Sequence, residues 1–223
     1  MYRLLGCLVV LFCASVFGEH APIDSAQTST RPTAERIKPD SRCRYRADLD
    51  LTDEKAIKKN NMECAIEIEV LRYTVARRLK IPASKINTSP YKEKVDENVK
   101  LLWNPDWSFI IRERARRMSR YSAGSGAEHN GFMGTEGAFA STFKDSKFSV
   151  QLKSENAWGN AWQGKGVEEI AYNLAEQPGI GWNHHPGHAE NVFTDCDMIG
   201  IGVHIDDNGY VTSYAQFASK KQS

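Results

Sequence analysis

The sequence predicts a layered α/β domain without parallel βαβ units, because segments with helical periodicity lead into a C-terminal β-hairpin. Met198 to Ile205 alternates enough for a strand, and Tyr210 to Phe217 predicts the returning strand. Between them, Asp207-Asn208-Gly209 is typical of a tight turn. The helical segments are expected at 62–79 and 104–121.

The first helix is predicted from apolar residues that recur at helical spacing, namely Ile66, Ile68, Val70, Leu71, Val75 and Leu79. Pro82 ends this helix, and a polar loop is expected to continue through Lys94.

The second helix is predicted from its start signals: Asn104 can cap it, and Pro105 suits the first helical position. One face then carries the apolar residues Trp107, Ile111, Ala115 and Met118. The other face carries five arginines, which predict a solvated surface, with an anion-binding patch as the alternative: Arg112, Arg114, Arg116, Arg117 and Arg120.

The next stretch, 131–166, is rich in glycine and aromatic residues and has no sustained period apart from a short helical pattern near Gly137–Phe143. Val167 to Gln177 again predicts a helix, which Pro178-Gly179 ends. Farther on, Pro186-Gly187 indicates a turn, and a short helix is expected to begin at His188.

Residues 1–18 predict a signal peptide, because a cationic start precedes a short apolar run and small residues precede a cleavage site. Residues 19–42 predict a flexible leader, and 43–61 an N-terminal extension of the folded domain. No later stretch is apolar enough to cross a membrane, so we expect a secreted protein whose mature chain has no transmembrane segment.

Cleavage leaves Cys43, Cys64 and Cys196, and in an oxidising compartment we expect one disulfide among the three pairings. We favour Cys43–Cys64, which would tie the front segment to the first helix. Asn87-Thr88-Ser89 is a sequon that predicts N-glycosylation at Asn87, although Pro90 directly after it is unfavourable for its use. The nearly balanced charge, 29 Lys and Arg against 28 Asp and Glu, gives no reason to expect nucleic acid or an anionic membrane as a partner.

Histidines are concentrated in the stretch WNHHPGHAEN at 182–191. His184 and His188 are four residues apart, but Pro186-Gly187 argues against the shared helical face that a simple zinc motif needs. His129 and Glu155 are further polar candidates. Together such imidazoles and carboxylates could bind a divalent metal, zinc being the usual choice, or perform acid-base chemistry; unrelated surface residues are the alternative. No activated serine or cysteine nucleophile is recognisable.

The segments GWNHHPGHAENVF and MIGIGVHIDDNGYVTSYAQF resemble the C-terminal signature of the CAP superfamily, which comprises cysteine-rich secretory, antigen-5 and pathogenesis-related proteins. The likeness is to its shorter, microbial-style branch. The residues in register are Trp182, Pro186, Gly187, His188, Asn191, Ile199, Gly200 and Gly202. LLWNPDWSFIIRERARRM and Ser154-Glu155-Asn156 also follow the order of the family's landmarks, and the resemblance covers 62–218, leaving 219–223 as a tail.

This resemblance implies a three-layer α-β-α sandwich with a small central antiparallel sheet. It also implies a metal-binding cleft, with zinc the expected ion, formed by His129, His188, Glu155 and Glu176. Three departures are visible: serine replaces the glycine before Glu155, His184 and His185 replace smaller residues, and the family's tryptophan on the preceding helix is absent or displaced to Trp182.

The resemblance further implies a non-enzymatic extracellular binding protein in defence or host interaction, with a sterol or fatty acid as ligand and extracellular protein partners. The alternative is a metal-dependent hydrolase, a peptidase, that uses the same cleft.

Overall fold

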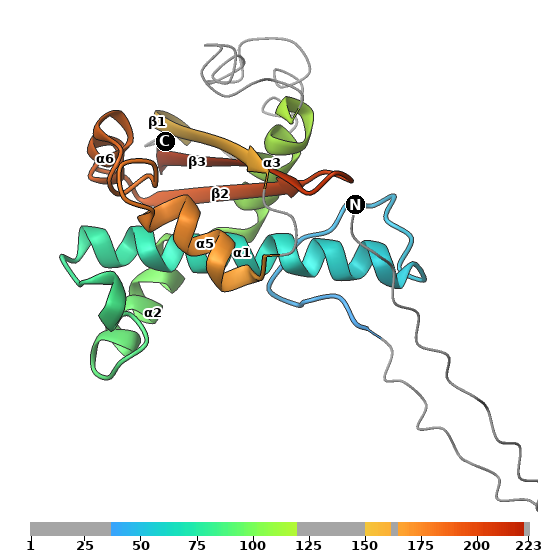
Figure 1. The fold of residues 1–223 in the computed structure, drawn as a ribbon, viewed down its shortest axis with the longest axis horizontal. Coiled ribbons are helices and arrows are strands. Elements are labelled where there is room, and N and C mark those ends of the chain that lie inside the picture. The colour runs from blue at the N-terminus through green and yellow to red at the C-terminus, as the bar shows by residue number, and fades with distance from the viewer. Residues whose placement is uncertain (1–36, 120–149, 162–164, 221–223) are drawn as a thin grey trace, which may run out of the picture. The chain divides into compact units, whose positions relative to one another are not determined.

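The computed structural model describes residues 37–119, 150–161 and 165–220. All of them belong to one compact unit, Arg36–Ser223. The elements, shown in Figure 1, are α1 (Glu54–Arg78), the 3₁₀ turn η1 (Ala83–Lys85), α2 (Tyr91–Leu102), α3 (Pro105–Met118), β1 (Val150–Ala161), α5 (Val167–Glu176), α6 (Pro186–Val192), β2 (Met198–Ile205) and β3 (Tyr210–Lys220). This mixture of helices with a small sheet confirms the α/β class.

The sheet has three antiparallel strands in the order β1-β3-β2. The predicted hairpin of β2 and β3 is confirmed, and its turn uses a left-handed Gly209 at φ 79°. The Asp206 carboxylate accepts hydrogen bonds from the N–H groups of Asn208 (2.9 Å) and Tyr210 (2.8 Å), which fixes the turn.

Helices cover both faces of this sheet. This follows from its strands, whose alternating side chains belong to two separate hydrophobic clusters. On β3, Ala215 and Phe217 pack in the cluster that includes α1 and α5. Their neighbours Tyr214 and Ala218 pack in the cluster that includes α3. Figure 1 shows α1 and α5 along one side of the strands. Each large apolar side chain buried in these layers stabilises the fold by roughly 1.5–3 kcal/mol.

Two glycines allow α3 to lie directly on β2. A Cβ at Gly200 would stand 2.0 Å from the Trp107 ring, and one at Gly202 would stand 2.1 Å from the backbone nitrogen of Arg112. Any side chain at these positions would therefore separate the helix from the strand. This close packing is the physical reason for glycine at both positions of the predicted strand.

Helix α1 begins at Glu54, eight residues before the predicted start, so part of the predicted 43–61 extension is helical. The Asp53 carboxylate caps it by accepting from the N–H groups of Lys55 (2.9 Å) and Ala56 (3.1 Å). Ile57 is buried in this first part of the helix. Residues 54–61 are mostly polar, so the cap at Asp53 and the one buried residue, Ile57, produce no periodic pattern in the sequence.

The prediction of a polar loop through Lys94 was wrong, because η1 and then α2 occupy this part of the chain. The exposed side of α2 is mostly polar, although Tyr91 and Leu101 are also exposed. A narrow stripe of Val95, Val99 and Leu102 packs against the main cluster at helical spacing. Such a stripe is too sparse to stand out in the sequence.

Strand β1 was also missed, since its sequence lacks the expected alternation. Its central residues Glu155 and Asn156 are polar and both are buried, one on each face of the sheet. The helix at 167–177 is confirmed as α5, and α6 begins at Pro186, where proline suits the first helical position. The short helical pattern near Gly137–Phe143 lies outside the described residues.

The arginines of α3 do not all face solvent as predicted. Arg112 and Arg114 are buried, with Arg112 donating to Glu67 of α1 at 2.7 and 2.6 Å. Burial by itself would lower the pKa of Arg112, but the Glu67 carboxylate raises it above its ordinary value. The two helices are therefore joined through an internal ion pair.

The outer edge of β2 is bonded to helix side chains. The N–H of Val203 donates to Glu67 (3.0 Å), and that of Ile205 donates to Glu63 (2.9 Å). The N–H of Ile201 donates to the hydroxyl of Ser108 in α3 (3.3 Å). These bonds satisfy backbone groups of β2 for which the described residues supply no neighbouring strand on that side.

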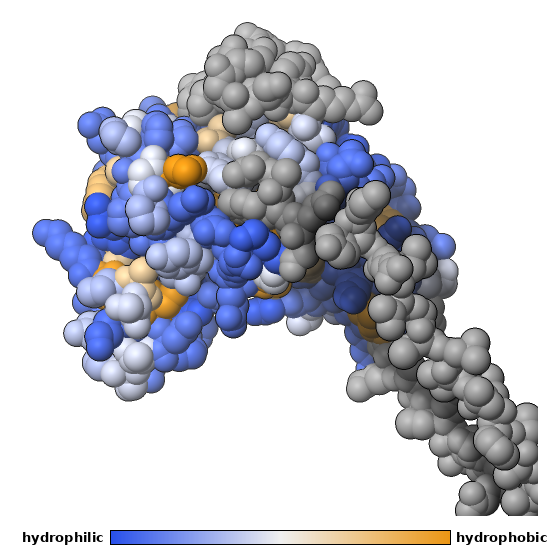
Figure 2. Space-filling model, in the orientation of Figure 1, coloured by the Kyte–Doolittle hydropathy of each residue, from blue (hydrophilic) through white to orange (hydrophobic). Residues whose placement is uncertain are grey.

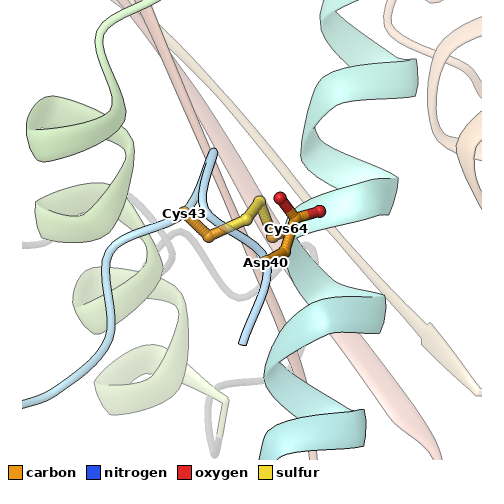
Figure 3. A group of neighbouring side chains, drawn as sticks. All are labelled: Asp40, Cys43 and Cys64. Carbon is orange, nitrogen blue, oxygen red and sulfur yellow. A yellow bond between two sulfur atoms is a disulfide. The ribbon is translucent and has the colours of Figure 1, made fainter. Parts of the chain in front are cut away.

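The predicted Cys43–Cys64 disulfide is present, and Figure 3 shows it joining the N-terminal segment to α1. The same segment reaches α3, because Arg44 forms an ion pair with Asp106 and its carbonyl accepts from Arg112 (3.0 Å). In the described parts of the chain, no helix has the length and apolar character needed to cross a membrane. The predicted signal peptide and most of the leader lie outside the described residues.

Removal of this disulfide should lower the stability of the domain. We expect the variant C43A/C64A to lose about 3 kcal/mol of unfolding free energy, because the bond closes a loop with a sequence separation of 21 residues. Urea denaturation measures the loss, and reduced wild type should match the variant. Equal unfolding midpoints for the variant and the oxidised wild type would show that the bond does not constrain the chain.

Candidate functional site

Two motif blocks that carry the family resemblance lie against each other, although about thirty residues separate them. The side-chain amide of Asn156 in β1 donates to the carbonyl of His188 in α6 at 3.1 Å. Asn191 of α6 donates back to the Glu155 carbonyl (3.2 Å) and to Oδ1 of Asn156 (2.8 Å). The two asparagines thus hold the start of α6 against the middle of β1.

His188 lies in the first turn of α6 and is partly buried. Its ring stands beside that of His185, with 4.6 Å between centroids and an angle of 38° between the planes. His184 precedes the helix, so the structure agrees that it does not share a helical face with His188. The imidazoles of His185 and His188 are therefore side by side, where α6 contacts Asn156 of β1.

Glu155 is turned toward α3. Its carboxylate accepts two hydrogen bonds from Arg114 (2.8 and 2.7 Å) and one from the amide of Gln216 (2.5 Å). Arg114 also lies over the ring of Tyr214, 4.6 Å from its centroid. Glu155 and Arg114 are both fully enclosed by protein. Since neighbouring residues of a strand face opposite sides, Asn156 faces α6 and Glu155 does not.

Glu176, at the end of α5, is held by the segment that follows it. It accepts a hydrogen bond from the side chain of Asn183, and its second oxygen lies 2.9 Å from Nε2 of His184. Asn183 and Trp182 are buried, and their N–H groups donate to the carbonyls of Ala175 and Leu174 (both 2.9 Å). The turn after α5 thus brings His184, predicted as a rim residue, to Glu176.

These positions do not fit one metal ion shared by Glu155, Glu176 and His188. Within the described ranges, the one group of three His, Cys, Asp or Glu residues with ligand atoms inside 4.8 Å is Asp40, Cys43 and Cys64 (Figure 3). Its sulfurs are joined in the disulfide and cannot act as thiolate ligands. His129, the remaining member of the predicted set, lies outside the described residues.

Cys196 is buried, and its Sγ lies 3.7 Å from Nη1 of Arg78. Burial raises the pKa of this thiol, an effect that Arg78 opposes. A buried thiol with a raised pKa is a poor nucleophile, in agreement with the sequence.

The sequence indicated no role for Arg114, Asn156 or Asn191 in the site. A buried acid such as Glu155 needs a cation nearby. The arginines of α3 were therefore the available candidates for its partner, but the sequence does not show which of them is buried. Asn191 was matched only as a position in the family pattern. No protein-family model matches this chain, and the search of curated proteins found no relative.

Proposed function

We propose that this chain is a secreted CAP-type protein that acts by binding and not by catalysis. One observation carries the proposal: Asn156 and Asn191 join the two blocks that resemble the family signature, SEN on β1 and PGHAEN on α6. Independent motif matches that arose by chance have no reason to be hydrogen-bonded in the fold. Helices on both faces of a small antiparallel sheet, the layering that the family resemblance implies, add to this support.

Binding is favoured over catalysis by the state of the candidate groups. The carboxylate of Glu155 is held by Arg114 and Gln216 and is not placed to serve as a general base. The thiol of Cys196 is buried with a raised pKa. We therefore assign His129 and His188 to the binding of a divalent metal, zinc by the preference of imidazole, and leave Glu155 out of that site.

A lipid ligand is the other part of this proposal. Figure 2 shows one face of the molecule as mainly hydrophilic, with hydrophobic residues in separate spots. The exposed large apolar side chains of the described residues are Ile37, Leu51, Tyr91, Leu101, Tyr172, Ile180 and Phe193. The hydrophobic spots on that face are separate from one another, so the proposal of sterol or fatty-acid binding rests on the family resemblance. A binding screen tests this proposal directly.

Zinc titration of the mature protein tests the metal site. We expect calorimetry to show zinc uptake by the wild type, loss of uptake in H129A/H188A, and retention in the matched control H184A/H185A. The purpose of the control is to separate the two proposed ligands from their histidine neighbours. No uptake by the wild type would remove the metal from the function, and loss in the control would move the site to His184 and His185.

A parallel screen separates the two functions. We expect a sterol or a fatty acid to bind with and without zinc, and a peptide library to remain intact when zinc is supplied. Library cleavage that disappears in H129A/H188A would replace the binding function with a peptidase. If no lipid binds, the ligand part of the proposal fails.

A further inference from the structure

A pocket of about 360 Å³ lies apart from α6 and its histidines. It is lined by side chains from α1, from the turn after η1 and from the start of α5. Those that matter here are Ile68, Glu69, Arg72, Tyr73, Asn87 and Glu168. Its size is at the lower end of the range for small-ligand sites, and its wall includes the predicted glycosylation residue, Asn87.

Asn87 is placed so that the folded domain can accommodate a sugar on its side chain. It is exposed in a turn, and its Oδ1 accepts a hydrogen bond from Nη2 of Arg72 at 2.8 Å. No hydrogen bond of the described residues uses its Nδ2, the atom to which an N-glycan is attached. Because attachment keeps the amide oxygen, the bond from Arg72 persists in the modified protein.

Arg72 gives this amide a rigid support. Its guanidinium is nearly buried and also donates to Asp96 (3.0 Å), to Glu69 (3.0 Å) and to the carbonyl of Ile86 (3.3 Å). With its fork fixed on several sides, Arg72 holds Oδ1 in place and so determines where Nδ2 points. An exposed asparagine without such a partner would rotate freely.

The pocket wall offers what an N-acetylhexosamine ring needs. Tyr73 and Ile68 supply apolar surface for the ring and its acetamide methyl group. Glu69 and Glu168 supply carboxylate oxygens that accept hydrogen bonds from sugar hydroxyls. Burial and the neighbouring Glu69 raise the pKa of Tyr73, so its phenol keeps its proton near neutral pH.

We propose that Asn87 carries an N-glycan whose first N-acetylglucosamine residue lies in the pocket between α1 and the start of α5. The linking Nδ2 belongs to a residue of the pocket wall, so the first sugar is attached next to the pocket and can enter it. The pocket is then filled by the chain's own modification and is not available to a free ligand. The inference rests on the proposed secretion, since the sugar is added in the secretory pathway.

The modification is tested by producing the full chain in a eukaryotic secretory host in two forms. One keeps residues 1–18, and in the other a known signal peptide replaces them. We expect intact mass and endoglycosidase digestion to show one N-glycan on wild type and none on N87Q. Failure of export with residues 1–18 alone would contradict the proposed secretion. Absence of a glycan from the form with the known signal peptide would contradict the site at Asn87.

The docking of the sugar is tested on glycoprotein trimmed to a single N-acetylglucosamine, with N87Q as the matched control. We expect slower amide hydrogen exchange in peptides that cover 65–73 and 165–170, and no change in β3, which does not line the pocket. The substitution E168K should reduce this protection without removing the glycan. Equal exchange in the trimmed protein and N87Q would show that the sugar projects into solvent.

Discussion

The substitution E67A is expected to lower the free energy of unfolding by about 3–5 kcal/mol. It removes the carboxylate that pairs with Arg112 and leaves a guanidinium buried between α1 and α3. It also removes the acceptor of the Val203 N–H, so a backbone donor loses its partner in the same place. Urea denaturation of wild type and variant measures the difference.

A matched control is E169A, which breaks the surface pair of Lys165 and Glu169 in α5. We expect this control to cost about 0.5 kcal/mol or less, because exposed pairs are screened by water. The double variant E67M/R112M should recover part of the loss, since no charge is then left unpaired. Comparable losses in E67A and E169A would mean that the interior pair contributes no more than a surface one.

The second large effect is expected for R114A. Without the guanidinium, the Glu155 carboxylate stays buried between α3 and the sheet, where the amide of Gln216 donates to it at 2.5 Å but the cation that balances its charge is gone. We expect a loss of about 3–5 kcal/mol, because an uncompensated charge is retained in the interior. The contact of Arg114 with the Tyr214 ring is lost as well. Thermal and urea unfolding both measure this loss.

The matched control for R114A lies two residues along the same helix. Arg116 is partly exposed and pairs with Glu113, so R116A should cost less than about 1 kcal/mol. Adding E155Q to R114A should restore stability by removing the unpaired charge. A zinc titration of E155Q that shows lost uptake in a folded protein would instead make Glu155 a ligand and contradict the structural role assigned to it.

Parts of the fold that are determined by local chemistry could be predicted from the sequence. The hairpin follows from strand alternation and from Gly209, and α3 follows from the cap of Asn104, whose Oδ1 accepts from the N–H of Trp107 (2.9 Å). The disulfide could be favoured because Cys64 lies on a clearly periodic helix. In each case the decisive residues are close together or chemically distinctive.

The rest depends on partners that are distant in the sequence. Strand β1 is stabilised by pairing with β3 and by the buried ion pair of its Glu155 with Arg114, and the residues of β1 alone reveal neither partner. The direction in which Glu155 points decides its role, and only the register of β1 on the sheet determines it. For the same reason, the position of His188 beside Asn156 could not be read from spacing alone.

The helix side chains along the outer edge of β2 have a consequence for assembly. A strand from another molecule could extend the sheet there only by taking the N–H groups that Ser108, Glu67 and Glu63 already accept. Two of these acceptors are buried glutamates, which would have to be displaced first. The β2 edge is thereby closed to β-augmentation and to strand-by-strand polymerisation.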